Sequence, residues 1–313
     1  MEHRVAVIDL GTNTFHLLIN SLEDNYSKIL HSEKQAVKIG VGGINQDIIP
    51  EAGLQRAINC LIDYKKKLDE WNVTLVLALG TSALRNAKNG KNVISRIKEQ
   101  TGIVVHLISG EQEAEYIYYG VRSAINLGKE KSLIVDIGGG SVEFIIGNNE
   151  EIFWKQSFEI GAQRLLEIYH KHDPILDSEV GQINEHFDNA LKPLQEAVEK
   201  FKPVTLAGSS GTFDTLSEIY CIKNNIPISR SDGETPLTIE EFFTIHKLLL
   251  SKNRTQRMHI PGMIEMRVDM IVVGSCLVSY LLKRFGLTNI RVSTYSLKEG
   301  AMAIEILRLK QLN

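Results

Sequence analysis

The chain has 313 residues, of which 43% are hydrophobic and 23% are charged, proportions that are ordinary for a globular protein and a length that fits two domains better than one. It carries 35 Lys and Arg against 38 Asp and Glu, a net charge of −3, so it lacks the basic excess that is typical of general nucleic-acid binders. Its three cysteines, Cys60, Cys221 and Cys276, are too few and too far apart for a disulfide framework or a zinc site.

The same features predict where the protein works. Sparse, separated cysteines are typical of a reducing compartment. The N-terminus lacks the apolar core of a signal peptide, and the longest apolar stretch, residues 270–282, is too short and too interrupted to span a bilayer. We therefore expect a cytoplasmic protein that binds neither nucleic acid nor membrane. The oligomeric state stays open, with a homodimer among the options.

The first half of the chain alternates strand-like and helix-like patterns. Its β-rich runs are bounded by Gly and Asn, and apolar residues recur at helical spacing between residues 50 and 71. We predict strands at residues 5–9, 15–20, 28–38, 73–79 and 103–107, and helices at residues 50–71 and 111–125.

The pattern restarts after residues 126–131, which we predict to be the domain junction. We expect strands at residues 132–136, 142–147, 204–207 and 290–292. We expect helices at residues 162–170, 179–200, 212–221, 239–251, 268–285 and 296–310.

An internal duplication relates the two halves. Aligning Asp9 with Asp136, an offset of 136 − 9 = 127, pairs two copies of one pattern: an apolar strand, Asp, an apolar residue, Gly, small residues and a second apolar strand. We therefore expect an α/β protein whose two related domains face each other across a cleft. Domain I would comprise residues 1–125 with a C-terminal helix at about 297–313, and domain II residues 126–296.

The two aligned turns are the first candidates for phosphate-binding loops. Backbone N–H groups and small hydroxyl side chains in a tight turn suit a phosphate, and an Asp at the end of a strand suits a magnesium ion. The first loop follows Asp9 and contains Gly11, Thr12 and Asn13. The second follows Asp136 and contains Gly138, Gly139, Gly140 and Ser141. Glu143 lies two residues beyond Ser141 on the same strand, so it could share a metal or its waters with Asp136.

A third small-residue loop comes between a predicted strand and a predicted helix, where free N–H groups and the helix dipole favour anions. It consists of Gly208, Ser209, Ser210, Gly211 and Thr212. An ordinary N-cap explains this pattern equally well.

The segment that begins at Ser109 carries acids at the start of a predicted helix, where Ser109 or Gly110 can act as the cap. Glu111 suits the helix dipole. A carboxylate here could also orient a water for attack on phosphorus, and spacing does not say whether Glu111, Glu113 or Glu115 does so.

Cationic side chains must offset the charge of a phosphorylated substrate. The candidates near turns or helix starts are Lys38, Arg85, Arg164, Arg267 and Lys298, with Arg85 the best placed. Each of them alone is more typical of a surface charge.

Together these motifs resemble the exopolyphosphatase and guanosine pentaphosphate phosphohydrolase family. The resemblance covers residues 5 to about 307 and rests on "IDLGTNTFHLLI", "ALGTSALRNAKNG", "ISGEQEAEYIYYGV", "VDIGGGSVEFIIG", "EIGAQRLLEIY" and "LAGSSGTFDTL". It implies an actin-like fold of two ribonuclease-H-like halves. It implies Glu113 as the catalytic base, and Asp136 and Glu143 as the catalytic and metal centre with Asp9 on the opposite wall. It implies that the glycine loops bind phosphate. Of the candidate cations, we expect Lys38, Arg85 and Arg267 to bind phosphate with them.

The chain departs from the family pattern at three positions. Lys38, Glu115 and Lys298 stand where Arg is frequent, which bears on substrate preference more than on activity. Longer members carry further helical domains, so we expect this short form to prefer shorter chains or to be less processive.

The resulting expectation is hydrolysis of the terminal phosphate of inorganic polyphosphate with Mg²⁺ or Mn²⁺, releasing orthophosphate. Guanosine pentaphosphate is the alternative substrate, which the sequence does not separate from polyphosphate. A small-molecule kinase of the same fold and a non-catalytic nucleotide sensor or actin-like scaffold are further alternatives.

Overall fold

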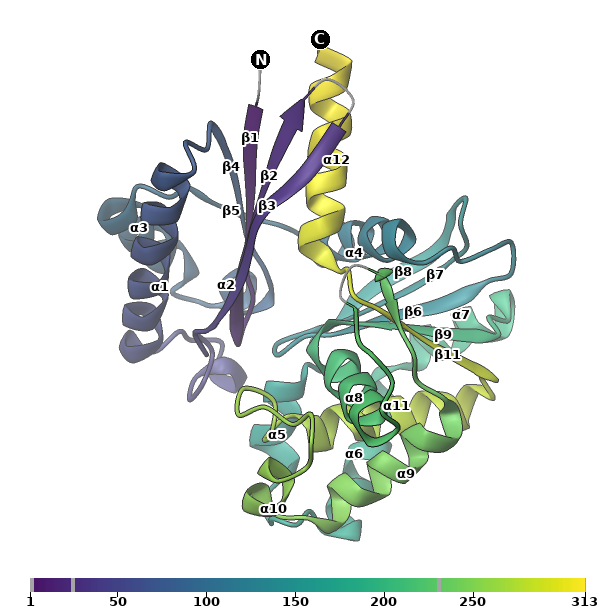
Figure 1. Cartoon of the computed structure of the whole chain (residues 1–313). Helices are drawn as coiled ribbons and strands as arrows, with labels where there is room; N and C mark the ends of the chain where they lie inside the picture. The colour runs from purple at the N-terminus through teal and green to yellow at the C-terminus, as the bar shows by residue number, and fades with distance from the viewer. Residues whose placement is uncertain (1–2, 24–25, 230–231, 313) are drawn as a thin grey trace. The chain divides into compact units, whose positions relative to one another are not determined.

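The computed structural model describes residues 3–23, 26–229 and 232–312. The chain divides into two compact units. Unit 1 comprises Met1–Gly120 and Leu297–Asn313, and unit 2 comprises Val121–Ser296. Each unit contains one β-sheet with helices packed against it (Figure 1).

The sheet of unit 1 has the strand order β3-β2-β1-β4-β5. Its strands are β1 (His3–Leu10), β2 (Thr14–Glu23), β3 (Tyr26–Ala36), β4 (Leu75–Gly80) and β5 (Val105–Leu107). β1 and β2 form an antiparallel hairpin, and β1 pairs in parallel with β4. Side chains alternate between the two faces of a strand, so Ala6, Ile8 and Leu10 enter the hydrophobic core while Asp9 lies on the other face.

The helices of unit 1 cover both faces of this sheet. They are the 3₁₀ turn η1 (Ile44–Gln46), α1 (Glu51–Glu70), α2 (Ser82–Asn86), α3 (Gly90–Thr101), α4 (Gly110–Ala124, which runs on into unit 2) and α12 (Leu297–Leu312). α1 and α3 pack together and supply much of the core on one face. α12 contacts β1 and β2, and Figure 1 shows it on the side away from α1 and α3.

The sheet of unit 2 repeats the same arrangement. Its order is β10-β11-β9-β6-β7-β8, with β6 (Ser132–Ile137), β7 (Val142–Gly147), β8 (Ile152–Phe158), β9 (Thr205–Ser209), β10 (Glu234–Thr235) and β11 (Asn289–Ser293). Without the edge strand β10, the order β8-β7-β6-β9-β11 corresponds strand by strand to β3-β2-β1-β4-β5. The duplication seen in two short motifs therefore extends through both sheets.

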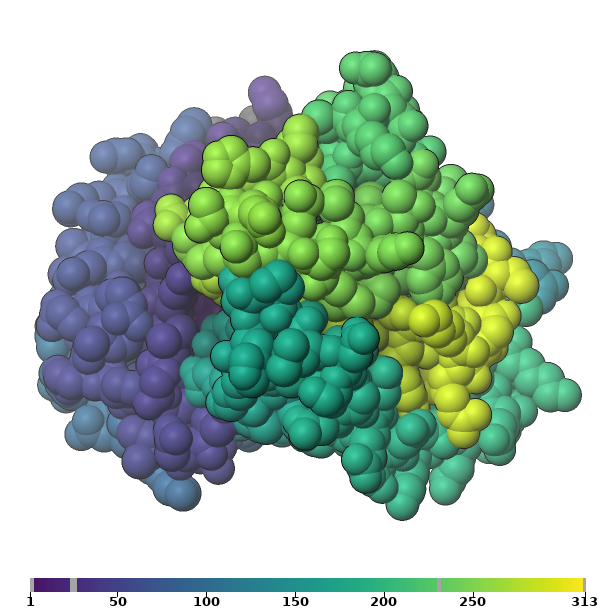
Figure 2. Space-filling view, turned by 90° about the horizontal axis from the view of Figure 1, so that it is seen from below, coloured from purple at the N-terminus to yellow at the C-terminus, as the bar shows by residue number. Residues whose placement is uncertain are grey.

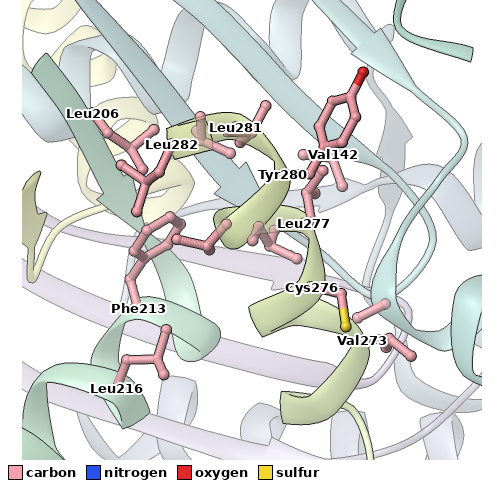
Figure 3. Packing of buried hydrophobic residues seen from close by; sticks show 14 of the residues in the cluster. Val142, Leu206, Phe213, Leu216, Val273, Cys276, Leu277, Tyr280, Leu281 and Leu282 are labelled. Carbon is pink, nitrogen blue, oxygen red and sulfur yellow. The ribbon is translucent and has the colours of Figure 1, made fainter. Parts of the chain in front are cut away.

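The helices of unit 2 surround a large hydrophobic core. They are α5 (Ala162–Tyr169), α6 (Asp177–Ala190), α7 (Lys192–Phe201), α8 (Ser210–Lys223), α9 (Ile239–Ser251), α10 (Arg254–Met258) and α11 (Ile271–Phe285). α11 is buried on all sides from Ile271 to Leu282, and Figure 3 shows its side chains packing toward Phe213 and Leu206. In the part of the chain that the structure describes, no helix is long and apolar enough to cross a membrane.

The segment between α9 and α11 is anchored to the loop between α5 and α6. On the face in Figure 2, the yellow-green residues around 250–270 lie beside the teal residues around 160–190. Arg257, 1% exposed, donates from Nη1 to Asp173 Oδ1 at 2.6 Å and from Nε to the carbonyl of Val268 at 3.1 Å. These bonds fix the backbone immediately after Arg267.

Several predicted elements were wrong in extent. The predicted helix at 179–200 is two helices, because Pro193 lies in the first turn of α7 and has no N–H to continue α6. α11 begins at Ile271 rather than at residue 268, and β3 ends at Ala36. Two substantial elements, α3 and β8, were not predicted.

Candidate active site

One row of side chains crosses the sheet of unit 2. The strand registers place Ser209, Asp136, Glu143 and Ser157 opposite one another on β9, β6, β7 and β8. Directly opposite residues project to the same face of a sheet. This face is the one away from the core, because Val135 and Phe144, next to the two acids, belong to the core. The two carboxylates predicted to share a metal are therefore neighbours.

Asp136 is held by hydroxyl groups. Its Oδ2 accepts hydrogen bonds from Ser209 Oγ at 2.8 Å, Ser210 Oγ at 2.7 Å and Ser296 Oγ at 2.5 Å. The side chain is 5% exposed, so these bonds satisfy a buried charge. Sequence reasoning missed Ser296, which lies in a loop far from the glycine motifs.

Glu143 has a hydroxyl partner of its own. Its Oε1 accepts a hydrogen bond from Ser157 Oγ at 2.7 Å. Ser157 lies on β8, which was not predicted as a strand. The β-branched and aromatic residues of Ile152–Phe158, which are typical of strands, are the signal that could have revealed it.

The glycine loop after β6 is fixed by α5. The carbonyl oxygens of Gly138, Gly139 and Gly140 accept hydrogen bonds from the N–H groups of Ala162, Gln163 and Gly161, at 2.9, 2.9 and 3.2 Å. Arg164 Nε also donates to the Gly140 carbonyl, at 2.9 Å.

This anchoring sets the direction of the loop's donors. In a trans peptide the N–H points opposite to the C=O. The N–H groups of Gly139, Gly140 and Ser141 therefore point away from α5. Gly161 is needed for the approach, since a Cβ on it would lie 2.4 Å from the Gly139 backbone. Arg164, a candidate cation from the sequence, is thereby a support of the loop.

The third loop joins β9 directly to α8, as predicted. The guanidinium of Arg267 lies against Gly211, where a Cβ would come within 2.0 Å of Cζ. Burial lowers the pKa of Arg267, and Asp214 and Asp136 act in the opposite direction. Among the residues that the structure describes, none provides a hydrogen-bond partner for its buried Nε. The structure thus brings Arg267 to the N-terminus of α8. In the same loop, Gly208 packs on the ring of Phe213, and the side chain of Thr212 packs on Gly274.

The geometry changes the role expected for Ser209 and Ser210. A hydroxyl has one proton to donate, and both donate it to Asp136. In this arrangement their side chains therefore cannot donate hydrogen bonds to a phosphate. Only the backbone N–H groups of the loop can do so.

Unit 1 carries the first predicted loop. Thr12 and Asn13 are buried in the turn between β1 and β2. The Asn13 carbonyl accepts from the N–H groups of Val37 and Lys38 at 3.0 and 2.9 Å, and Lys38 has a positive φ of 50°. A Cβ on Gly11 would lie 2.8 Å from the Thr14 carbonyl oxygen, so glycine is required for the turn. Lys38 and the Asp9 loop are therefore directly linked.

Glu113 and Arg85 form a second group in unit 1. Arg85 Nη1 donates to Glu113 Oε2 at 2.7 Å and to the Ile108 carbonyl at 3.1 Å. Ser109 caps α4 by accepting from the Gln112 N–H, while Gln112 Oε1 accepts from the Ser109 N–H, both at 3.1 Å. The predicted cap is confirmed. Lys298, another candidate cation, forms an ion pair with Glu299 at 2.7 Å.

A family model matches most of the chain. The model, described as "Ppx/GppA phosphatase family", matches residues 18–309. The chain belongs to the Ppx/GppA phosphatase family. It is therefore a hydrolase of phosphoanhydride bonds, and the resemblance seen in the sequence is confirmed.

Individual relatives agree with this family. A crystal structure of an exopolyphosphatase from Cytophaga hutchinsonii is 44% identical, with a TM-score of 0.95 and 98% of both chains covered. A PPX-GPPA enzyme of Aquifex aeolicus is 27% identical with a TM-score of 0.78, covering 96% of this chain and 99% of that one. The expected α/β fold with two sheets is thus confirmed, and it is the fold of these enzymes.

Curated relatives carry both activities in their names. A putative exopolyphosphatase of Haemophilus influenzae is 26% identical over 95% of this chain and 90% of its own length. A guanosine-5'-triphosphate,3'-diphosphate pyrophosphatase of Photobacterium profundum is 28% identical over 94% of this chain, which spans 58% of that protein.

The donor set of this Ppx/GppA member suits a magnesium ion that binds together with phosphate. Mg²⁺ typically uses one or two carboxylates, water and substrate oxygens. Asp136 and Glu143 supply two neighbouring carboxylates, and the hydroxyl bonds to Asp136 end on Oδ2, which leaves Oδ1 for a metal or its water. Among residues 3–23, 26–229 and 232–312, no group of three or more His, Cys, Asp or Glu forms a metal cage. Asp9, predicted as a third ligand, lies in unit 1.

Proposed function

We propose that this protein is an exopolyphosphatase, which releases orthophosphate from the end of inorganic polyphosphate with the help of Mg²⁺. The observation that carries the proposal is the glycine loop at 138–141, whose N–H groups point away from α5 beside Asp136 and Glu143. The 44% identity with a protein named exopolyphosphatase supports polyphosphate as the substrate.

Unit 2 would bind the phosphate that is removed. The N–H groups of Gly139, Gly140 and Ser141 would donate hydrogen bonds to its negative oxygens and stabilise the charge of the transition state. Arg267, at the start of α8, would add a cation. Asp136 and Glu143 would hold Mg²⁺, whose chemistry is to neutralise the phosphate oxygens.

Unit 1 would supply the base. Glu113 would take a proton from a water, and the water oxygen would form a bond to phosphorus while the bond to the leaving phosphate chain breaks. Arg85 would hold the Glu113 carboxylate in a fixed orientation through its charge-assisted hydrogen bond. We propose that both groups of residues act on the same terminal phosphate, with the loop after Asp9 and Lys38 binding the substrate as well.

The test is orthophosphate release from long-chain polyphosphate with Mg²⁺, comparing wild type with Glu113→Gln. The variant keeps the shape of the side chain and loses the base, so we expect turnover to fall by about 10²- to 10⁴-fold with binding retained. Glu111→Gln is the matched control, because Glu111 is exposed on the same helix. Near-normal turnover in Glu113→Gln would falsify the assignment of the base.

Guanosine pentaphosphate is the second candidate substrate, because the Photobacterium profundum relative is named for this nucleotide. Guanosine pentaphosphate added as a competitor distinguishes the two. No release from polyphosphate by the wild type, together with hydrolysis of guanosine pentaphosphate, would move the assignment to the nucleotide.

A further inference from the structure

Three hydroxyl groups converge on one oxygen of Asp136, from three different parts of the chain. Ser209 ends β9 and is register-paired with Asp136. Ser210 is the first residue of α8. Ser296 lies between β11 and α12. Ser210 Oγ and Ser296 Oγ are also 3.2 Å apart, so the two hydroxyls are in contact with each other as well as with the carboxylate.

The backbone is arranged to bring the last two hydroxyls there. Ser210 has a φ of 69°, a left-handed conformation that is unfavourable for a non-glycine residue and is typically found at functional sites. Ser296 follows a turn in which Ser293 Oγ donates to the Tyr295 carbonyl at 2.8 Å and accepts from the Tyr295 N–H at 3.1 Å. Ser296 also directly precedes α12, so it stands at the N-cap position of that helix as well as beside Asp136.

All three bonds end on Oδ2, and none of them uses Oδ1. We propose that Ser296, with Ser210, is a positioning residue that fixes the Asp136 carboxylate so that Oδ1 is presented to the Mg²⁺–phosphate group. Ser296 does not touch the substrate. It acts through Asp136, and it is the last residue of unit 2 before Leu297 begins α12. This inference rests on the proposed function for the identity of the ligand.

Two variants isolate the hydroxyl. Ser296→Ala removes the donor that lies 2.5 Å from Oδ2, and Ser296→Thr keeps it. A hydrogen bond to a charged group is worth enough for a roughly tenfold effect. We expect Ser296→Ala to raise the Mg²⁺ concentration for half-maximal orthophosphate release by about tenfold, and Ser296→Thr to restore it largely.

The control is Ser217→Ala. Ser217 is buried in the same unit and donates to the Pro236 carbonyl at 2.7 Å, away from Asp136. It loses a comparable hydrogen bond, so it reports any effect of lowered stability alone. Thermal unfolding by circular dichroism shows whether each variant is folded.

A binding readout separates this inference from the proposed function. Mn²⁺ is titrated into each protein in the presence of orthophosphate and followed by electron paramagnetic resonance. Weaker Mn²⁺ binding in folded Ser296→Ala, but not in Ser217→Ala, supports the positioning role even if wild type fails to hydrolyse polyphosphate. Unchanged Mn²⁺ binding and an unchanged Mg²⁺ midpoint in Ser296→Ala would overturn it, even if polyphosphate is hydrolysed.

Discussion

Glu113 differs from its acidic neighbours on α4 in burial and in partner. Successive helical residues are about 100° apart, so Glu111 and Glu115, four residues apart, share one face of the helix and Glu113 leaves it on the opposite side. Glu111 is exposed and Glu115 is half-buried, whereas Glu113 is 6% exposed and ion-paired with Arg85. A buried, oriented carboxylate is what a general base requires. Burial and the ion pair with Arg85 therefore distinguish Glu113 from the other two glutamates.

Gly211 offers a test of the Arg267 site. Gly211→Ala would put a Cβ about where the Arg267 guanidinium lies, so the cation must move. We expect KM for polyphosphate to rise by about 10- to 100-fold, since a charge-assisted hydrogen bond contributes about 1.5–3 kcal/mol. Steady-state kinetics measures the effect.

Gly181→Ala is the matched control for that substitution. Gly181 lies in α6 with open space around the added Cβ, so its replacement should leave KM unchanged and raise stability by up to about 1 kcal/mol. An equal KM for wild type and Gly211→Ala would remove Arg267 from the substrate site.

Among the elements, α9 and α11 meet at a buried polar contact. His246 Nδ1 lies 2.9 Å from Ser275 Oγ, and Ser275 Oγ donates to the Val272 carbonyl at 2.7 Å. Because the serine proton is used for Val272, the histidine donates from Nδ1 to Ser275 Oγ. Burial, and to a lesser extent Lys283, lowers the pKa of His246 to about 4. This pair of helices is therefore sensitive to acid.

That sensitivity predicts a dependence of stability on pH. The pKa of His246 is lowered from its ordinary 6.5 to about 4 in the folded protein, so the unfolded chain binds an extra proton between these values. We expect the free energy of unfolding to fall as pH drops from about 6.5 to about 4. Urea unfolding of wild type and His246→Gln at pH 7 and pH 5 measures it. The variant should lose less stability between the two pH values, and parallel losses would contradict the prediction.

Across the whole molecule, the two sheets repeat one topology but differ in the charges they carry. The row in unit 2 reads Ser209, Asp136, Glu143 and Ser157, while the equivalent strands of unit 1 pair Asp9 with His16 and His16 with Lys34. His16 stands at the position of Glu143, since 143 − 16 equals the offset of 127. The duplicated fold thus has its neighbouring carboxylates in unit 2, where we propose the metal binds.

Removal of the metal tests whether the ion acts in catalysis or stabilises the fold. The described residues form no cage of three or more metal ligands, so the ion should bind with the substrate and contribute little to folding. We expect EDTA to abolish orthophosphate release and excess MgCl₂ to restore it. The Tm in EDTA should stay within about 2 °C of the Tm in MgCl₂. A much larger drop would indicate a metal that stabilises the fold.

The sequence by itself determined the strand–loop–strand pattern and its duplication, because period-2 hydrophobicity and glycine turns are local properties. From the same pattern it indicated that Asp136 and Glu143 are neighbours, since a hairpin of known length sets its own register. It also marked the third loop, because a strand followed directly by small residues and a helix is visible locally.

Only the tertiary structure decided the contacts between residues distant in sequence. Arg267 meets Gly211, Ser157 meets Glu143, and Ser296 meets Asp136 across 160 positions. Such contacts depend on which strands become neighbours and on how α11 and the loops return to the sheet. No local propensity encodes them, because they form through the packing of the whole unit.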